Sequence, residues 1–409
     1  MKINIFRHGF PIIGIITLFF CFSCKNSDIQ STVSKVDVPT LMERGDKIKL
    51  GKEWDQIQNL YAQKLSDLRK NKNDNNAKLV LAQLFIKEAR VTGEHGHYYP
   101  SALKMLNSIL EDQKIDKDLH FRALMTKAGV ELSLHEFDKA LATGTAALGM
   151  NNRNAQIYGV MVDANVELGN YKEAIAYADK MVSIKPDLKS YARVAYLREI
   201  HGDVEGAISA LKLSVQAAYP GTEEAAWASQ TLGDLLFQYE KIQEAESTYN
   251  YILRTRADYP FAVAALGDIH LQKNNFVEAE AKYKEAMDII PEVSYYVQLA
   301  KLYKKQNRTS EMMVLKDEIF EMLEDDVASG HNMNLEYADI YLDLLDDPKK
   351  ALKYANLEYE KRPSNIDVNR MIAKIYLSLD DKTKAKDHMA MASITNSIHP
   401  DLKELQEVL

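Results

Sequence analysis

The sequence predicts an all-α solenoid of about ten helix–turn–helix repeats, and three observations support this fold class. The stretch Pro260–Pro291 contains two helix-length segments with apolar residues at three- or four-residue spacing, joined by a polar turn at Asn274 and Asn275. The same pattern returns along the chain at intervals of 33 or 34 residues. The composition, 46% hydrophobic and 27% charged over 409 residues, is ordinary for a folded chain.

Within Pro260–Pro291, residue size predicts how the two helices pack. Gly267 and Ala279 are small enough to let the helices cross closely, while Phe276 and Tyr283 are bulky enough to fill the space around the crossing. Pro291 ends the second helix because proline lacks an N–H and its ring clashes with the preceding turn. One such pair cannot bury its own apolar face, so neighbouring copies are required.

These residues resemble the signature of the tetratricopeptide repeat, a helix–turn–helix unit of 34 residues. The resemblance implies a right-handed α-solenoid over residues 38–392, in which the first helix of each pair lines a concave surface. His270 and Val263 stand where the family prefers other residues. The matching residues are Leu266, Gly267, Phe276, Ala279, Tyr283, Ala286 and Pro291.

The first predicted repeat starts near Val38 and departs from the repeat pattern. It carries Trp54 and Tyr61 on its second helix. Residues 90–100 and 324–333 interrupt the period, and we expect each to form an irregular loop. Residues 393–409 hold a last helix, opened by Pro400, with the polar outer side that an array needs at its end. The other repeats are expected to start near Asn75, Phe121, Ala155, Leu188, Ala226, Pro260, Val293, Asn332 and Ile366.

The N-terminus predicts a lipoprotein signal peptide over residues 1–23. Lys2 and Arg7 give a positive start, an uncharged apolar run follows, and the ending CFSC resembles a bacterial lipobox. Cys24 is then the lipidated residue, and residues 24–37 form a flexible tether. An uncleaved anchor or a core helix is the alternative, although the polar residues that follow argue against a core helix.

Charge and cysteine content narrow the function classes. Cys21 and Cys24 are the only cysteines, so a chain cleaved before Cys24 has no disulfide. Removing residues 1–23 deletes two positive charges from a formal −8 and gives −10. This acidic balance excludes an electrostatic nucleic-acid binder. We expect a lipid-anchored protein of the bacterial envelope, in the outer membrane and facing the periplasm or the exterior.

No sequence motif predicts catalysis or a cofactor. The chain has no glycine-rich phosphate loop, no HExxH and no cysteine nucleophile beyond Cys24. One cluster within residues 90–100 offers possible ligands, and it could be a metal site with a third ligand from elsewhere, a contact for a partner, or a packed loop. Its members are Glu94, His95, His97, Tyr98 and Tyr99.

The resemblance also implies a set of inward-facing residues on the first helices. The predicted groove is acidic in the middle, interrupted by aromatic side chains, and basic at its far end. Carboxylates in a concave surface favour a basic or amide-rich partner segment; the alternative is that these are solvated helix faces. The residues are Asp163, Tyr196, Glu199, Trp227, Gln230, Asp234, Phe261, Asp268, Lys301 and Lys304.

The sequence therefore predicts a non-enzymatic scaffold that binds a partner protein or peptide in this groove and touches the membrane only through its lipid. Two alternatives are an outer-membrane lipoprotein that binds a glycan nutrient and a protein that handles metal through His95 and His97. The sequence leaves the partner and the oligomeric state open.

Overall fold

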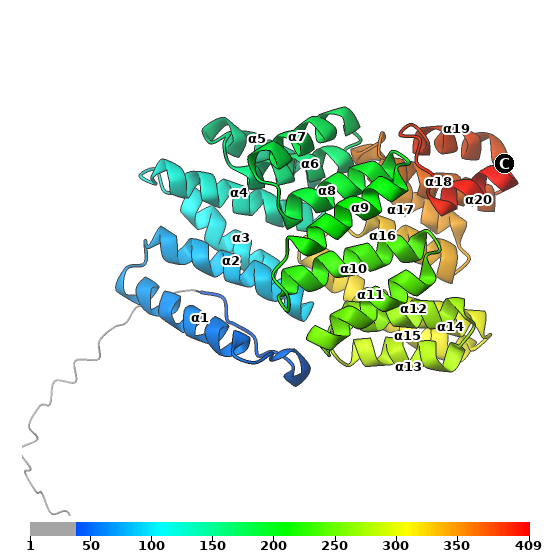
Figure 1. Ribbon diagram of the computed structural model, residues 1–409, viewed down its shortest axis with the longest axis horizontal. Coiled ribbons are helices and arrows are strands. Elements are labelled where there is room, and N and C mark those ends of the chain that lie inside the picture. The colour runs from blue at the N-terminus through cyan, green and yellow to red at the C-terminus, as the bar shows by residue number, and fades with distance from the viewer. Residues whose placement is uncertain (1–37) are drawn as a thin grey trace, which may run out of the picture. The chain divides into compact units, whose positions relative to one another are not determined.

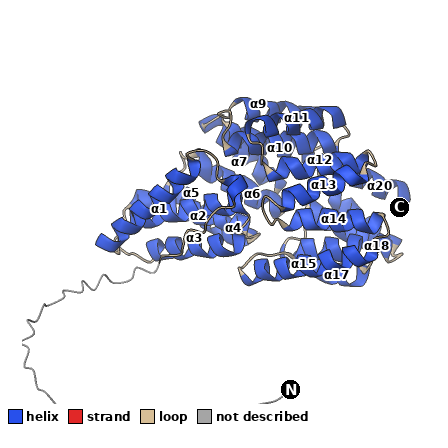
Figure 2. Ribbon diagram, turned by 90° about the horizontal axis from the view of Figure 1, so that it is seen from below, coloured by secondary structure: helices blue, strands red, loops and turns tan. Residues whose placement is uncertain are grey.

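The apolar periodicity produces helices throughout residues 38–409, the part of the chain that the computed structural model describes (Figure 1). These residues contain no strand, as Figure 2 shows, and the predicted right-handed α-solenoid is confirmed. The predicted signal peptide, Cys24 and the tether lie outside the described residues. No helix within residues 38–409 is long and apolar enough to cross a membrane.

Nine antiparallel helix pairs follow one another in the described range, preceded by α1 (Glu53–Lys70) and followed by α20 (Pro400–Val408). In the eighth pair, the first helix, α16, continues into a π-helical turn over Ile340–Leu344. The pairs are α2 (Asn75–Thr92) with α3 (His95–Leu110), α4 (Lys117–Ser133) with α5 (Phe137–Met150), α6 (Ala155–Glu167) with α7 (Tyr171–Ile184), α8 (Leu188–Ile200) with α9 (Val204–Gln216), α10 (Glu223–Gln238) with α11 (Ile242–Thr255), α12 (Pro260–Gln272) with α13 (Phe276–Met287), α14 (Val293–Lys305) with α15 (Thr309–Ala328), α16 (Asn334–Asp339) with α17 (Pro348–Lys361), and α18 (Ile366–Ser378) with α19 (Lys382–Ala392).

Local chemistry fixes where many helices begin. The side chain of Asp74 accepts a hydrogen bond from the backbone N–H of Ala77, and Asp116 does the same for the start of α4. Asp187 and Ser190 form a reciprocal capping box at the start of α8. Each cap satisfies N–H groups that the first helical turn leaves without partners.

The pair α12/α13 packs as the sequence predicts. A β-carbon placed on Gly267 would lie 2.7 Å from Cε1 of Tyr283, so only glycine permits this contact with the tyrosine ring. Tyr283 is fully buried, and so is Ala279 beside it. The close crossing therefore depends on a missing side chain on one helix and a large ring on the other.

We expect Gly267→Ala to lower the free energy of unfolding by about 1–3 kcal/mol, because the added methyl overpacks against Tyr283. Gly129→Ala is a matched control, since a β-carbon on Gly129 in α4 meets nothing within 4 Å. Alanine has the higher helix propensity, so the control should gain up to about 1 kcal/mol. Urea denaturation measures both. Equal effects of the two substitutions would contradict the packing described.

The first helices form the inner side of the curved array. Successive first helices contact one another, as in α2 with α4, α4 with α6, α6 with α8, and α10 with α12, whereas successive second helices lie farther apart. A stack whose members are closer on one side curves toward that side. The inner surface is therefore lined by first helices, as the resemblance implied.

The array also returns on itself, a feature that the sequence did not predict. The backbone N–H of Asn332 donates to the carbonyl of Leu134 at 3.1 Å. Farther along, the amide of Asn365 donates to the carbonyl of Glu167 at 3.0 Å, and the hydroxyl of Tyr171 accepts from the N–H of Ile366 at 2.8 Å. Helices α3 and α15 are also in contact. We call these contacts the inter-turn junction.

Three boundary predictions were wrong. The first repeat lacks its first helix, because residues 38–45 are not helical and only a 3₁₀ turn at Asp46–Ile48 precedes α1. Residues 90–100 are not a loop, because α2 extends to Thr92 and α3 begins at His95. Residues 324–333 are helical as far as Ala328, the end of α15. In the last two cases longer helices absorb the extra residues, which preserves backbone hydrogen bonds.

Candidate functional site

Two aspartates occupy the middle of the inner surface on consecutive first helices. Oδ1 of Asp234 accepts hydrogen bonds from the amide of Gln230 and the hydroxyl of Tyr249, both at 2.8 Å. Oδ1 of Asp268 accepts from the hydroxyl of Tyr283 at 2.7 Å. No lysine, arginine or histidine within residues 38–409 forms an ion pair with either aspartate. One oxygen of each therefore remains available to a partner.

Their surroundings hold the pKa of both groups above the ordinary range. Burial raises the pKa of Asp234 to about 6, although solvent reaches its side chain, because the surrounding helices displace most of the bulk water. Burial also raises the pKa of Asp268 to about 6, and the charge of Asp234 adds to this effect. The two carboxylates thus sense one another across neighbouring repeats.

Other charged groove residues already have partners within the chain. Asp163 accepts from Nε of Arg193 at 2.8 Å, and Lys301 contacts Asp339 at the same distance. Lys304 contacts Asp346 at 2.8 Å and also donates to the carbonyl of Asp343 at 2.7 Å. The predicted basic end of the groove is therefore offset by acidic groups of the following repeat.

Glu199 is a correction to the predicted groove. Its side chain is buried, and Oε1 accepts hydrogen bonds from the hydroxyl of Tyr239 at 2.5 Å and the amide of Gln238 at 3.2 Å. The carboxylate therefore joins successive repeats and is not free to meet a partner.

The aromatic residues of the predicted groove differ in how much of each side chain is exposed to solvent. Tyr196 and Trp227 are 40% and 38% exposed, which is high for large apolar side chains. Phe261 is half-buried and packs against the rings of Tyr259 and Tyr295, with centroids 5.4 and 6.2 Å away. Tyr196 and Trp227 are therefore the more exposed aromatic groups of the predicted groove, and Trp227 lies on α10, the helix that also carries Asp234.

The cluster of residues 94–99 is divided between core and surface. Tyr98 and Tyr99 are buried and belong to the core, which corrects their prediction as partner contacts. Nε2 of His97 lies 2.7 Å from the carbonyl of Thr40, whereas the His95 ring stacks on Tyr99 with a centroid distance of 5.4 Å. The two imidazoles are thus engaged in different directions. Within residues 38–409, no group of three or more His, Cys, Asp or Glu side chains is placed to hold a metal ion.

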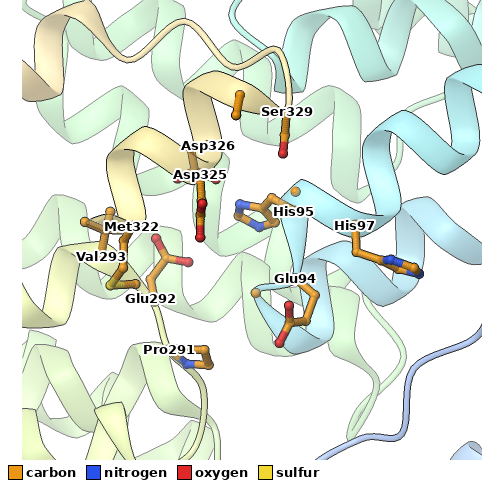
Figure 3. Close-up of a pocket in the computed structure, with 13 residues that line it drawn as sticks. Glu94, His95, His97, Pro291, Glu292, Val293, Met322, Asp325, Asp326 and Ser329 are labelled. Carbon is orange, nitrogen blue, oxygen red and sulfur yellow. The ribbon is translucent and has the colours of Figure 1, made fainter. Parts of the chain in front are cut away.

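His95 and Glu94 nevertheless line a cavity of about 390 Å³ at the inter-turn junction, which we call the junction pocket. Its opposite wall is formed by Glu292, which precedes α14, and by Asp325 and Asp326 near the end of α15. Figure 3 shows the carboxyl groups of Glu292 and the two aspartates gathered on one side of the pocket, facing His95. Sequence reasoning missed this site because its two walls lie about 200 to 230 residues apart in the sequence.

Burial and like charges control protonation in the junction pocket. Burial raises the pKa of Glu292 to about 7, with a further contribution from Asp326, and it raises the pKa of Asp326 to about 6, with a contribution from Asp325. Burial lowers the pKa of His95. It also lowers the pKa of His331 behind the pocket to about 4, and His95 and His135 reinforce that shift.

These shifts predict that the protein becomes more stable as the pH falls from 8 to 6.5. Glu292 and Asp326 have folded-state pKa values of about 7 and 6, above their ordinary 4.5 and 3.8, so their contribution to stability is lost as the pH rises through 6–7. The histidine shifts have the opposite sign, but they act only below their ordinary 6.5. Thermal unfolding at pH 6.5, 7.0 and 8.0 measures the effect. A midpoint that rises with pH over this window would contradict it.

Comparison with protein families agrees with the repeat pattern. Models described as tetratricopeptide repeat match residues 155–188 and residues 231–293. These segments cover α6 and α7, and then much of α10 together with α11 to α13. Tetratricopeptide repeats are thus present in this chain, and they support a scaffold for protein–protein interaction, a role that is generally non-enzymatic.

The chain is also similar to solved structures. One belongs to the crystal structure of the APC/C hetero-tetramer Cut9–Hcn1, with 15% identity, a TM-score of 0.44, and coverage of 87% of this chain and 66% of that chain. Another is pilF of Pseudomonas aeruginosa, with 13% identity, a TM-score of 0.34, and coverage of 63% and 99%, respectively. No curated protein matches the sequence.

Proposed function

We propose that this chain is a membrane-tethered scaffold of the bacterial envelope that holds a partner protein or peptide against its inner surface. Cys24 carries the lipid in this proposal, and the lipid confines the array to the membrane where its partner is found. The tetratricopeptide repeats support the scaffold role, and the N-terminal residues of the sequence support the tether.

The observation that carries the proposal is the arrangement of Asp234 and Asp268. Each has a hydrogen-bonded carboxylate without a cationic partner in the described chain, and Trp227, on the same helix as Asp234, is exposed. Tyrosine and tryptophan present large apolar surfaces at little cost in conformational entropy. A partner segment with a lysine or arginine next to an apolar residue matches both features.

The test is a cross-linking pull-down from intact membranes with the wild-type chain and Asp234→Asn/Asp268→Asn. Asparagine keeps an oxygen to accept from Tyr249 and Tyr283 but removes both charges. We expect the variant to capture at least about tenfold less partner than the wild type, because hydrogen bonds to charged groups contribute about 1.5–3 kcal/mol each.

Glu244→Gln/Glu278→Gln is the matched control. It removes the same number of charges from exposed positions on the second helices α11 and α13. Capture should be unchanged in this control, and circular dichroism should show equal helix content in all three proteins. A partner captured equally by the wild type and the Asp234→Asn/Asp268→Asn variant would rule out the inner surface as the binding face.

A further inference from the structure

Residues 38–52, which we call the N-terminal strap, contain no α-helix, and few backbone hydrogen bonds hold them to the array. Over residues 38–45, only Met42 donates its backbone N–H to the described chain, to the hydroxyl of Tyr98 at 3.1 Å. The hydroxyl of Tyr61 donates to the carbonyl of Pro39 at 3.0 Å. A segment with so few backbone hydrogen bonds opens at a lower free energy than the helices beneath it.

One buried side chain anchors the strap. Arg44 is 2% exposed, and its Nε and Nη2 donate to the two carboxylate oxygens of Glu88 in α2 at 2.8 and 2.7 Å. Glu88 is fully buried, and Glu53 at the start of α1 accepts a further bond from Arg44 at 3.2 Å. The attraction within a buried ion pair is largely offset by the cost of desolvating both charges. The pair therefore fixes where the strap docks without making its docking strongly favourable.

The strap also contacts a part of the array that is distant in sequence. Ile48 belongs to one apolar cluster with Val91 at the end of α2, Val263 in α12 and Ile290 after α13. Val263 and Ile290 follow Ile48 by more than 200 positions. The strap thus joins the first complete helix pair to the sixth.

The same end of the strap covers a residue of the predicted groove. Ile48 and Leu50 line a cavity of only about 20 Å³ together with Phe261 and Tyr259, which leaves room for little more than one water molecule. Phe261 is therefore closed off from a partner on the side where the strap lies.

We propose that the N-terminal strap is a detachable latch. When docked, it closes the first complete helix pair onto the sixth and covers the Phe261 end of the inner surface; its release opens both. The predicted lipid attachment at Cys24 precedes the strap in the sequence, so the strap is the first described segment between the predicted anchor and the array. Access of a partner to Phe261 after release rests on the proposed function, whereas release itself does not.

Hydrogen exchange of the full-length chain, followed by mass spectrometry, tests the latch with Arg44→Gln/Ile48→Ala. This variant removes the buried cation and most of the apolar contact of Ile48. We expect amide exchange in residues 259–295 to become at least about tenfold faster, because losing one partner of a buried ion pair strongly destabilises the docked state. Exchange in α9, which shares no apolar cluster with the strap, should not change. Lys47→Gln, which removes an exposed cation of the strap, is the matched control and should leave exchange at the wild-type rate.

A peptide added to the variant separates release of the strap from loss of folding. A synthetic peptide of residues 38–52 with blocked ends is supplied at about 1 mM, the order of the effective concentration of a tethered segment. It should restore slow exchange to residues 259–295 of Arg44→Gln/Ile48→Ala, and the same peptide with Arg44→Gln should not.

Three results would overturn the latch. They are faster exchange throughout the variant, α9 included, wild-type exchange in the variant, and failure of the wild-type peptide to restore protection. The cross-linking pull-down tests the effect on the inner surface, and Arg44→Gln/Ile48→Ala should capture more partner than the wild type. Equal capture, with exchange and peptide results as expected, would overturn control of the inner surface alone. Absence of any captured partner with the wild type would count against the proposed function and leave the exchange results to decide the latch.

Discussion

Arg362→Ala should lower the free energy of unfolding by about 3–5 kcal/mol, the cost of breaking a buried ion pair by removing one partner. Arg362 is 6% exposed and donates from Nε to Glu358 at 2.5 Å. It also pairs with Glu167 on the facing part of the array, and its guanidinium lies 4.8 Å from the ring centroid of Phe137. Alanine leaves Glu358, which is 1% exposed, as a buried charge without its cation.

Arg198→Ala is the matched control for this prediction. Arg198 pairs with Asp203 at 2.7 Å, but both side chains are about half exposed. Exposed pairs contribute roughly 0–1 kcal/mol, so the control should lose no more than that. Urea denaturation followed by circular dichroism measures both variants. A loss for Arg362→Ala as small as that of the control would show that the inter-turn junction adds little to stability.

Gly169→Ala should have the second largest effect, because it places a methyl group against the backbone of the facing repeat. Gly169 has φ +81°, a conformation that costs an alanine about 1–2 kcal/mol. In addition, a β-carbon there would lie 2.6 Å from the carbonyl carbon and oxygen of Ser364, so the two parts of the array must move apart. We expect a total loss of about 3 kcal/mol or more.

Gly221→Ala isolates the backbone strain from the clash. Gly221 also has φ +81°, but a β-carbon there meets nothing within 4 Å. The control should therefore lose only the strain, about 1–2 kcal/mol. The difference between the two midpoints in urea measures what close approach at the junction contributes. If the two losses are equal, the approach of Gly169 to Ser364 is not required for stability.

The fold could be predicted because local rules repeat along the chain. Apolar spacing, the small residues Gly267 and Ala279, and the terminating Pro291 all act within one repeat, and the helix pairs from α4 to α13 follow from them. Prediction failed where the period is broken. Extra residues around Gly93 and after Glu324 lengthen helices instead of forming loops, because a helix satisfies each added backbone group and a loop does not.

The inner surface could be predicted in position but not in chemistry. The repeat register places Asp234 and Asp268 inward, yet it does not show which carboxylates find partners. One signal was available: Asp234 and Tyr249 are 15 residues apart, as are Asp268 and Tyr283, and both pairs are hydrogen-bonded. The inter-turn junction had no such signal, since contacts like that of Glu167 with Arg362 join residues 195 positions apart and follow no period.

The inter-turn junction changes how this array can unfold. In a solenoid whose repeats contact only their neighbours, end repeats can melt one at a time, and folding can begin anywhere and spread. Here, unravelling α18 and α19 also strips the contacts that Tyr171 and Glu167 make with residues 365 and 366. The C-terminal end of the array and the third helix pair are therefore coupled in unfolding, and the long sequence separation of these contacts slows the search for the native state. A solenoid without such contacts can be extended gradually, one repeat after another. Here the contacts of the inter-turn junction must break before the array can extend.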